Sequence, residues 1–234
     1  MFNTLHNDDC FESMKNIPTG SVDLILSDPP FGITRNPWDT PIDLTKLWAE
    51  YNRIIKSNGV IVLLSATPFD KMLGASNIEN LKYEYIWVKT EATGFFMAKQ
   101  RPLRKHENIL VFYSQKPTYN PQFTSGKPYK YKKSGKVSGS YGTHDYHEKE
   151  WVNDGKRYPT SLLEFKKDRG LHPTQKPVAL MEFLIKTYTN EGDLVLDNFM
   201  GSGSTGVAAK NLGRSFIGIE MDPTIFNLAK DRLL

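Results

Sequence analysis

The chain has 234 residues, of which 39% are hydrophobic and 24% are charged. This balance is ordinary for a globular protein and excludes collagen, a coiled coil and wholesale disorder. The longest apolar run, residues 59–66, is far shorter than the roughly 18–20 residues of a membrane span. We also expect no signal peptide, because the first residues lack a basic and then apolar segment. A single cysteine, Cys10, excludes an intrachain disulfide and favours a reducing, cytoplasmic compartment.

The charge of the chain is unevenly distributed. The net charge is only +4, from 30 Lys and Arg against 26 Asp and Glu. Residues 99–136, however, hold ten basic residues and one acid, Glu107, so the rest of the chain is net acidic. A basic segment on an acidic body indicates contact with a polyanion such as nucleic acid. On charge alone, a solvated charged loop is the alternative.

The first half of the chain alternates apolar runs with amphipathic stretches. The spacing of apolar residues predicts strands at 22–27, 60–64, 83–88 and 109–113 and helices at 42–56 and 68–78. Asp28-Pro29-Pro30 should end the first strand, since proline cannot donate to a ladder. Asn58-Gly59 should end the first helix.

Residues 117–170 have a different composition, in which Gly, Ser, Lys and Tyr dominate and apolar periodicity disappears. A long irregular stretch inside a compact protein is usually functional or partly disordered. Regular patterns then return, with helices predicted at 177–188, 201–212 and 223–233 and strands at 194–197 and 216–220. Pro177 is expected at the first helical position. The alternation of strands and helices predicts an α/β fold with a mainly parallel, twisted sheet.

A glycine turn near the end of the chain predicts a nucleoside cofactor. Gly201, Gly203 and Gly206 have the G-x-G-x-x-G spacing between a predicted strand and helix, and Glu220 ends the next strand. Backbone N–H groups of such a turn can face a ligand, and the carboxylate can accept both ribose hydroxyls. No Lys follows Gly206, so this is not a P-loop. Tight packing of strand against helix is the alternative. Few strands follow this unit, so the rest of the sheet should come from earlier residues, in a permuted order.

An Asp-Pro-Pro-Phe turn follows the first predicted strand, at the sheet edge where ligands of open α/β folds bind. Pro29 and Pro30 fix the backbone and donate no N–H, so their carbonyls can face a ligand. Asp28 adds acceptor oxygens and Phe31 a flat apolar face. The combination suits a planar base with an exocyclic amino group, whereas a proline strand stop is the alternative.

These motifs together resemble those of the β group of amino-group DNA methyltransferases, which use S-adenosylmethionine. Asp28 to Phe31 resembles their catalytic motif, and Asp197-x-Phe199-x-Gly201-x-Gly203 resembles their cofactor motif. The segment 172–177, His-Pro-Thr-Gln-Lys-Pro, is similar to the one that precedes the cofactor motif. The resemblance implies a single Rossmann-like methyltransferase domain with the catalytic motif before the cofactor motif. Its parts are a catalytic half at 1–116, an inserted irregular target-recognition region at 117–170 and a cofactor-binding half at 171–234.

The resemblance also assigns roles to residues. Asp28 and the carbonyl of Pro29 would bind the target amino group, and Phe31, where Tyr is commoner, would stack on the flipped base. Pro30 completes this catalytic set. The implied cofactor-binding residues are Asp9 and Cys10 for the adenine, Glu220 for the ribose, His172, Thr174 and Lys176 for the methionine moiety, and Asp197, Phe199, Gly201 and Gly203 for the shape of the pocket.

The basic residues supply a candidate DNA surface. The residues expected there are Arg101, Arg104, Lys105, Lys127, Lys130, Lys132, Lys133 and Lys136. Tyr129 and Tyr131 interleave with the lysines, and lysines suit phosphates whereas aromatic rings suit unstacked bases. We expect no metal site, because the run His144 to Glu148 has no further ligands at zinc spacing.

The predicted function is transfer of a methyl group to N6 of adenine in duplex DNA after base flipping. Within the family, Asp-Pro-Pro-aromatic favours adenine, and N4 of cytosine remains the nearest alternative. More remote alternatives are an NAD-linked oxidoreductase, which leaves Asp28 to Phe31 unexplained, and a catalytically silent DNA-binding protein, which leaves both intact motifs unexplained. The expected partners are duplex DNA, a second copy of the chain and a cognate restriction endonuclease, in a bacterial or phage-infected bacterial cell.

Overall fold

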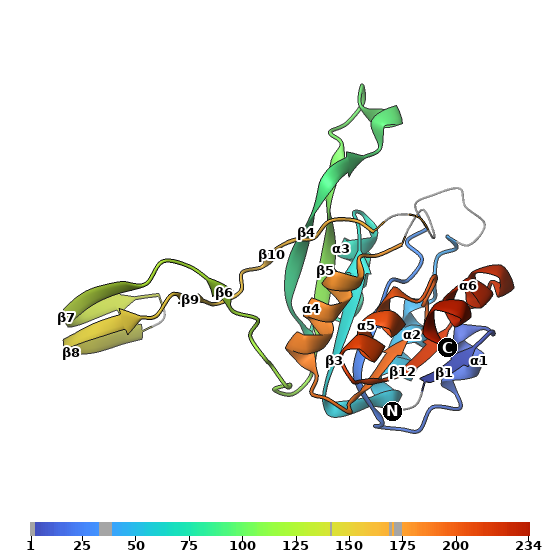
Figure 1. Ribbon diagram of the computed structural model, residues 1–234, viewed down its shortest axis with the longest axis horizontal. Helices are drawn as coiled ribbons and strands as arrows, with labels where there is room; N and C mark the ends of the chain where they lie inside the picture. The colour runs from blue at the N-terminus through green and yellow to red at the C-terminus, as the bar shows by residue number, and fades with distance from the viewer. Residues whose placement is uncertain (1–2, 33–38, 141, 169, 171–174) are drawn as a thin grey trace. The chain divides into compact units, whose positions relative to one another are not determined.

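The computed structural model describes residues 3–32, 39–140, 142–168, 170 and 175–234. The chain divides into two compact units, a large one of Met1–Asn120 with Ser161–Leu234 and a small one of Pro121–Thr160. The large unit contains an eight-stranded sheet with helices on both faces (Figure 1). None of the helices in the described part of the chain is long and apolar enough to cross a bilayer.

The large unit contains the strands and helices expected from the sequence and, in addition, the elements Asn3–His6, Cys10–Met14 and Leu162–Glu164, which were not predicted. Its strands are β1 (Asn3–His6), β2 (Val22–Ser27), β3 (Ile55–Ser65), β4 (Leu81–Thr93), β5 (Arg104–Phe112), β10 (Leu162–Glu164), β11 (Leu194–Asp197) and β12 (Ser215–Ile219). Its helices are α1 (Cys10–Met14), α2 (Leu44–Ile54), α3 (Phe69–Ser76), the 3-10 turn η1 (Phe95–Met97), α4 (Val178–Tyr188), α5 (Ser204–Asn211) and α6 (Pro223–Leu233).

The strand order confirms a mainly parallel sheet with a permuted chain order. The strands lie in the order β1-β12-β11-β2-β3-β5-β4-β10. In the described sheet only β5 runs antiparallel to its neighbours, β3 and β4, and the other pairs are parallel. The late strand β11 therefore lies beside the early strand β2, so the two halves of the chain join in the middle of the sheet.

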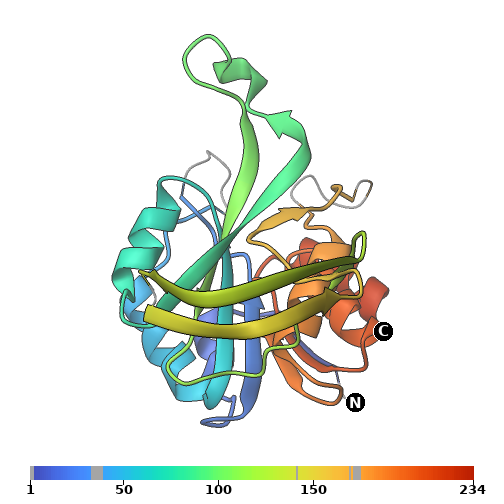
Figure 2. The same cartoon turned by 90° about the vertical axis from the view of Figure 1, so that its left-hand side faces the viewer.

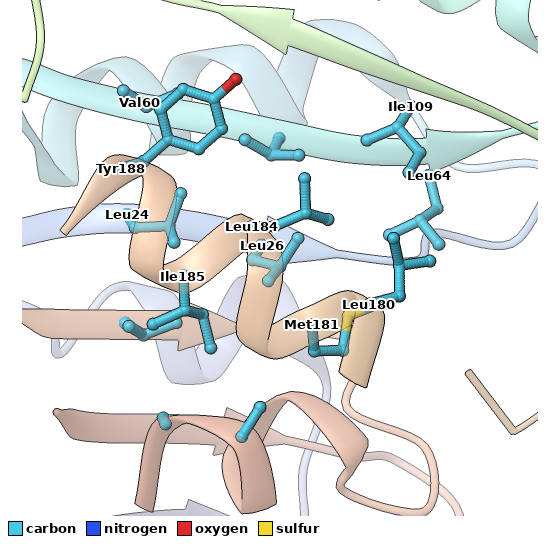
Figure 3. Packing of buried hydrophobic residues seen from close by; sticks show 14 of the residues in the cluster. Leu24, Leu26, Val60, Leu64, Ile109, Leu180, Met181, Leu184, Ile185 and Tyr188 are labelled. Atoms are coloured by element: carbon cyan, nitrogen blue, oxygen red, sulfur yellow. The ribbon is translucent and has the colours of Figure 1, made fainter. Parts of the chain in front are cut away.

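Two apolar cores form because the buried strands alternate their side chains between the faces of the sheet. Leu24 and Leu26 of β2 belong to the core under α4, α5 and α6, whereas Ile25 belongs to the core under α1, α2 and α3. Figure 3 shows Leu184 and Ile185 of α4 facing the strand side chains of the first core. The sequence reads as continuous apolar runs because both faces of these strands are covered.

Several predicted boundaries differ from the structure, most of all those of the strands expected at 83–88 and 109–113, which are Leu81–Thr93 and Arg104–Phe112. Three other differences have a local cause. The helix expected over 42–56 ends at Ile54, because Ile55 is already extended and pairs with Val22 of β2, which places Gly59 inside β3. Pro177 is the N-cap of α4 rather than its first helical residue. The helix expected from residue 201 begins at Ser204, because the two glycines before it have positive φ angles, which an α-helix excludes.

The small unit is a long hairpin rather than an irregular region. β7 (Tyr129–Gly139) pairs with β8 (Gly142–Asn153), as Figure 2 shows. The short strands β6 (Thr124–Ser125) and β9 (Lys156–Arg157) pair separately. Apart from the half-buried Asn153, the described side chains of β7 and β8 are exposed on both faces of the hairpin. Because neither face is buried, the apolar alternation that would have predicted strands is absent from the sequence.

Candidate active site

The two motifs meet at the carboxyl ends of neighbouring strands. β2 and β11 pair in parallel, so the Asp-Pro-Pro-Phe turn after β2 lies next to the glycine turn after β11. The Ser27 hydroxyl at the end of β2 donates a 2.6 Å hydrogen bond to Oδ1 of Asp197 at the end of β11. Residues 170 positions apart in the sequence are thereby fixed side by side.

A cavity of about 990 Å³ opens at this edge of the sheet. The sequence-predicted residues that line it are Asp9, Cys10, Asp28, Pro29, Pro30, Phe31, Arg104, Lys176, Asp197, Phe199, Gly201 and Glu220. Gly203 is not among the lining residues; it packs against α6, where a Cβ atom would lie 3.2 Å from the Cβ of Ala229. His172 and Thr174 lie outside the described residues.

Asp28 presents one paired and one unpaired oxygen. Its Oδ2 accepts a short charge-assisted hydrogen bond from the Lys176 ammonium. Its Oδ1 is buried and has no hydrogen-bond partner among the described residues. Burial raises the pKa of Asp28 above the ordinary carboxyl range, and the charge of Lys176 opposes that rise. Phe31 stacks on Phe69 with ring centroids 5.5 Å apart, which holds its ring at the cavity wall.

A chain of alternating charges supports Lys176, and sequence reasoning missed two of its members. Glu107 of β5 lies 3.6 Å from the Lys176 ammonium and 3.1 Å from that of Lys89 on β4. Burial lowers the pKa of Lys176, but attraction to Asp28 and Glu107 outweighs it, so that pKa is raised overall. Burial also lowers the pKa of Lys89, which Glu107 only partly restores. Glu107 was visible in the sequence as the one acid of residues 99–136.

The glycine turn is closed by the carboxylate that ends β12. The Gly201 N–H donates to Oε2 of Glu220 at 3.0 Å, and the Asp222 N–H donates to Oε1 at 2.9 Å. Gly201 has φ +50°, and open space lies where its Cβ would be, so a ligand can approach the backbone there. Each carboxylate oxygen accepts more than one hydrogen bond, so Glu220 keeps capacity for ribose hydroxyls. Burial raises the pKa of Asp197 to about 6.

Asp9 and Cys10 lie where β1 passes into α1. Oδ1 of Asp9 caps that helix by accepting from the Phe11 and Glu12 N–H groups. Burial raises the pKa of the Cys10 thiol to about 12, so it is no thiolate nucleophile. Asn198, which sequence reasoning missed, accepts from the Tyr51 hydroxyl at 2.6 Å, and its amide nitrogen lacks a partner among the described residues.

The predicted DNA-contacting residues fall into two groups, one in each unit. Arg101, Arg104 and Lys105 belong to the hairpin of β4 and β5 in the large unit. Lys127, Lys130, Lys132 and Lys136 are exposed in the small unit, and the side chain of Lys133 lies outside the described part of the chain.

In the small unit, strand alternation separates the lysines from the aromatic residues. Tyr131 stacks on Tyr129 and Trp151, with ring centroids 5.8 and 6.3 Å away, whereas Lys130 and Lys132 occupy the intervening positions of β7. The Arg157 guanidinium lies 4.9 Å from the centroid of the Tyr129 ring. Lys130 and Lys132 therefore lie on the opposite face of the hairpin from Tyr129 and Tyr131, rather than on the single interleaved surface expected. No group of three metal-ligating side chains occurs among the residues that the structure describes, and those of 144–148 are outside them.

An open, mainly parallel sheet that brings a glycine turn and an acidic proline turn into one cavity defines an α/β enzyme with a nucleoside cofactor. Residues 22–231 match the DNA methylase family, and the chain belongs to that family. It is 31% identical to "DNA adenine methyltransferase YhdJ" of Escherichia coli (strain K12), over 98% of this chain and 82% of that one.

Two further comparisons agree with this assignment. The chain is 29% identical to "Type II methyltransferase M.HpaI" of Haemophilus parainfluenzae, over 95% of this chain and 71% of that one. Its fold is similar to that in the crystal structure of the M1.HpyAVI–SAM complex, with a TM-score of 0.69 and 30% identity, over 99% of both chains.

Proposed function

We propose that this protein transfers a methyl group from S-adenosylmethionine to the exocyclic N6 of adenine in duplex DNA. The observation that carries the proposal is the unpaired Oδ1 of Asp28, a buried acceptor in the same cavity as the glycine turn. The exocyclic amino group of a nucleobase can donate the hydrogen bond that Oδ1 of Asp28 lacks. The choice of adenine is supported by the name of the relative from Escherichia coli.

The residues around the glycine turn fit the cofactor. Glu220 suits the ribose, and the wall formed by Asp9 and Cys10 suits the adenine. The Asn198 amide nitrogen and the Ser204 hydroxyl line the cavity and lack partners among the described residues, so both can bind a polar ligand. When bound, S-adenosylmethionine supplies an electrophilic methyl group on its sulfonium.

Asp28 prepares the amino group for attack. The lone pair of an aromatic amino nitrogen is delocalised into the ring, which makes the nitrogen a poor nucleophile. Hydrogen bonds from that amino group to Oδ1 of Asp28 and to the Pro29 carbonyl localise the pair on nitrogen, while Phe31 stacks on the base. As the N–C bond forms and the C–S bond breaks, the nitrogen becomes acidic and its proton passes to Asp28 or to water. Positioning and electrostatics supply most of the acceleration.

Lys176 keeps Asp28 ionised and orients it. Its ammonium binds Oδ2, which leaves Oδ1 for the substrate. The role differs from contact with the methionine moiety of the cofactor, which the family resemblance implied, although the cavity position of Lys176 is compatible with both.

The test is a nucleoside digest. Mixed-sequence duplex DNA is incubated with the protein and S-adenosylmethionine, hydrolysed and examined by mass spectrometry. N6-methyldeoxyadenosine is expected, and N4-methyldeoxycytidine would correct the base while keeping the mechanism. No methylated nucleoside, with cofactor binding demonstrated, would refute the proposal. Asp28→Ala should abolish transfer and leave cofactor binding within about twofold, because its side chain faces the base rather than the glycine turn.

The small unit is proposed as the target-recognition region. Residues 121–160 contain eight Lys or Arg against four Asp or Glu, which suits a polyanion. Replacing this unit with that of a relative of different specificity should change the methylated sequence and not the methylated base. The resemblance further predicts a homodimer and a cognate restriction endonuclease; light scattering of the purified protein tests the first.

A further inference from the structure

Two phenylalanines are exposed at the tip of a hairpin that begins beside the cavity. We call residues 89–107 the arm; it comprises the outer halves of β4 and β5 and the turn η1 between them, and Figure 1 shows it extending past the end of the sheet. Phe95 is 77% exposed and Phe96 fully exposed. Large apolar side chains displayed together at a tip indicate a binding surface.

The tip is a hydrogen-bonded turn rather than a loose loop. Gly94 has φ +88°, which lets the chain reverse at the end of β4. The Met97 N–H donates to the Gly94 carbonyl, the Ala98 N–H to Phe95 and the Arg101 N–H to Met97, each within 3.0 Å. The backbone that carries the two rings is therefore ordered before any partner binds, which reduces the backbone entropy lost on binding.

The surroundings of the two rings are cationic. Residues 94–105 contain Lys99, Arg101, Arg104 and Lys105 and no acid. Among the described residues, none of these four forms an ion pair, and Arg104 donates to the Thr67 carbonyl at 3.1 Å. Flat apolar rings among cations that form no ion pair in the described part of the chain complement a partner with stacked planar groups and a regular row of anions. Duplex DNA has both.

The arm begins at the active site. Lys89, Thr93, Arg104 and Glu107 all line the cavity that contains Asp28. Phe96 follows Thr93 by three residues, so their Cα atoms lie within about 10 Å of each other. That span equals roughly three base-pair steps at about 3.4 Å each. Because Thr93 lines the cavity that contains Asp28, DNA that delivers a base into this cavity passes close to the arm.

We propose that Phe96, with Phe95 beside it, inserts into the base stack next to the target and fills the gap left by the extruded base. The proposal rests on the base flipping of the proposed function. Extrusion breaks stacking on both sides of the target, and an inserted ring restores part of it. Lys99, Arg101 and Lys105 would hold the adjoining phosphates.

An abasic duplex tests the insertion without requiring methyl transfer. Two mixed-sequence duplexes are compared, one fully paired and one with a single abasic site, which offers a preformed gap for a ring. The wild-type protein should bind the abasic duplex about tenfold or more tightly than the paired one, as expected from the stacking of one aromatic ring on bases. Phe95→Ala/Phe96→Ala should lose this preference, and Phe96→Trp should retain it.

Ile78→Ala is the matched control, because Ile78 is 65% exposed, apolar, and lies between α3 and β4. This variant should keep the wild-type preference. Equal binding of both duplexes by the wild-type protein, or a preference that survives in the double alanine variant, would overturn the insertion. So would tighter binding to anionic lipid vesicles than to either duplex. Failure of the proposed function is seen separately, as absence of methylated nucleosides in the digest while the abasic preference persists.

Discussion

Removing the charge of Glu107 should destabilise the folded protein far more than removing the charge of an exposed glutamate. The Glu107 side chain is 14% exposed and lies between the ammonium groups of Lys89, 2% exposed, and Lys176, 14% exposed. Glu107→Gln leaves Lys89 with no carboxylate partner in the described part of the chain. A buried cation without a counter-charge is the costly product of this substitution.

The distances set the size of the effect. At an effective dielectric constant of about 20, charges 3.1 and 3.6 Å apart attract by about 5 kcal/mol each. Desolvation has already offset part of this attraction, and breaking a buried pair by removing one partner typically costs about 3–5 kcal/mol. We therefore expect Glu107→Gln to lower the free energy of unfolding by about 3–5 kcal/mol. The double variant Lys89→Met/Glu107→Gln should recover most of this loss, because no unpaired charge remains on Lys89.

Urea denaturation at neutral pH, followed by circular dichroism, measures these values. Glu12→Gln is the control, because Glu12 pairs with Lys15 at 2.6 Å but is 61% exposed, so its loss should cost less than about 1 kcal/mol. A cost for Glu107→Gln as small as that of the control would refute the reasoning. A double variant as unstable as the sum of its single variants would show that the two charges are not coupled.

Three further outcomes are expected. Because the pKa of Asp28 is raised, the single-turnover rate of methylation should already fall at a pH above the ordinary carboxyl range as the solution is made more acidic. Lys176→Met removes the charge that opposes this rise, so the fall should then begin at a still higher pH. The pKa of Asp197 is about 6 in the folded protein and near 3.8 in the unfolded chain. Its ionisation should therefore lower the free energy of unfolding as pH rises from about 4 to 6. Asp197→Asn should remove this pH dependence, as measured by urea denaturation at several pH values. Gly206→Ala should cost about 1–3 kcal/mol in thermal melts, because its Cβ would lie 2.6 Å from the Phe216 ring, whereas Gly74→Ala should be nearly neutral.

The fold could be predicted because the buried strands carry a strong local signal. The runs at 22–27 and 194–197 are apolar on both faces, and the glycine turn and Glu220 follow in the order that a nucleotide-binding unit requires. The sequence predicts a permuted strand order, and the structure adds that the two strands, β2 and β11, are neighbours in the sheet. The ends of the elements were less predictable. Asn58-Gly59 was expected to end the helix before it, but the chain is already extended at Ile55, which pairs with Val22.

The site was predictable only where residues form compact motifs. Asp28 to Phe31 and Asp197 to Gly201 are contiguous, so composition and spacing reveal them. Lys89 and Glu107 come from opposite strands of one hairpin and meet only through the register of β4 against β5, which the sequence does not encode locally. Phe95 and Phe96 also carry no signal, since a pair of aromatic residues usually indicates core.

The two residues that flank the small unit form defined hydrogen bonds within the large unit. The chain leaves the large unit at Asn120, whose N–H donates to the Thr187 carbonyl at 2.7 Å and whose amide donates to the Thr189 carbonyl at 3.0 Å. These are carbonyls of the last turn of α4 and of its C-cap, which need donors. The chain returns at Ser161, whose carbonyl accepts from the Ile86 N–H of β4 at 2.8 Å. Asn120 and Ser161, which flank residues 121–160, are thus each held by a backbone hydrogen bond within the large unit. These flanking contacts are made with α4 and β4, whereas the candidate site is built at the ends of β2 and β11.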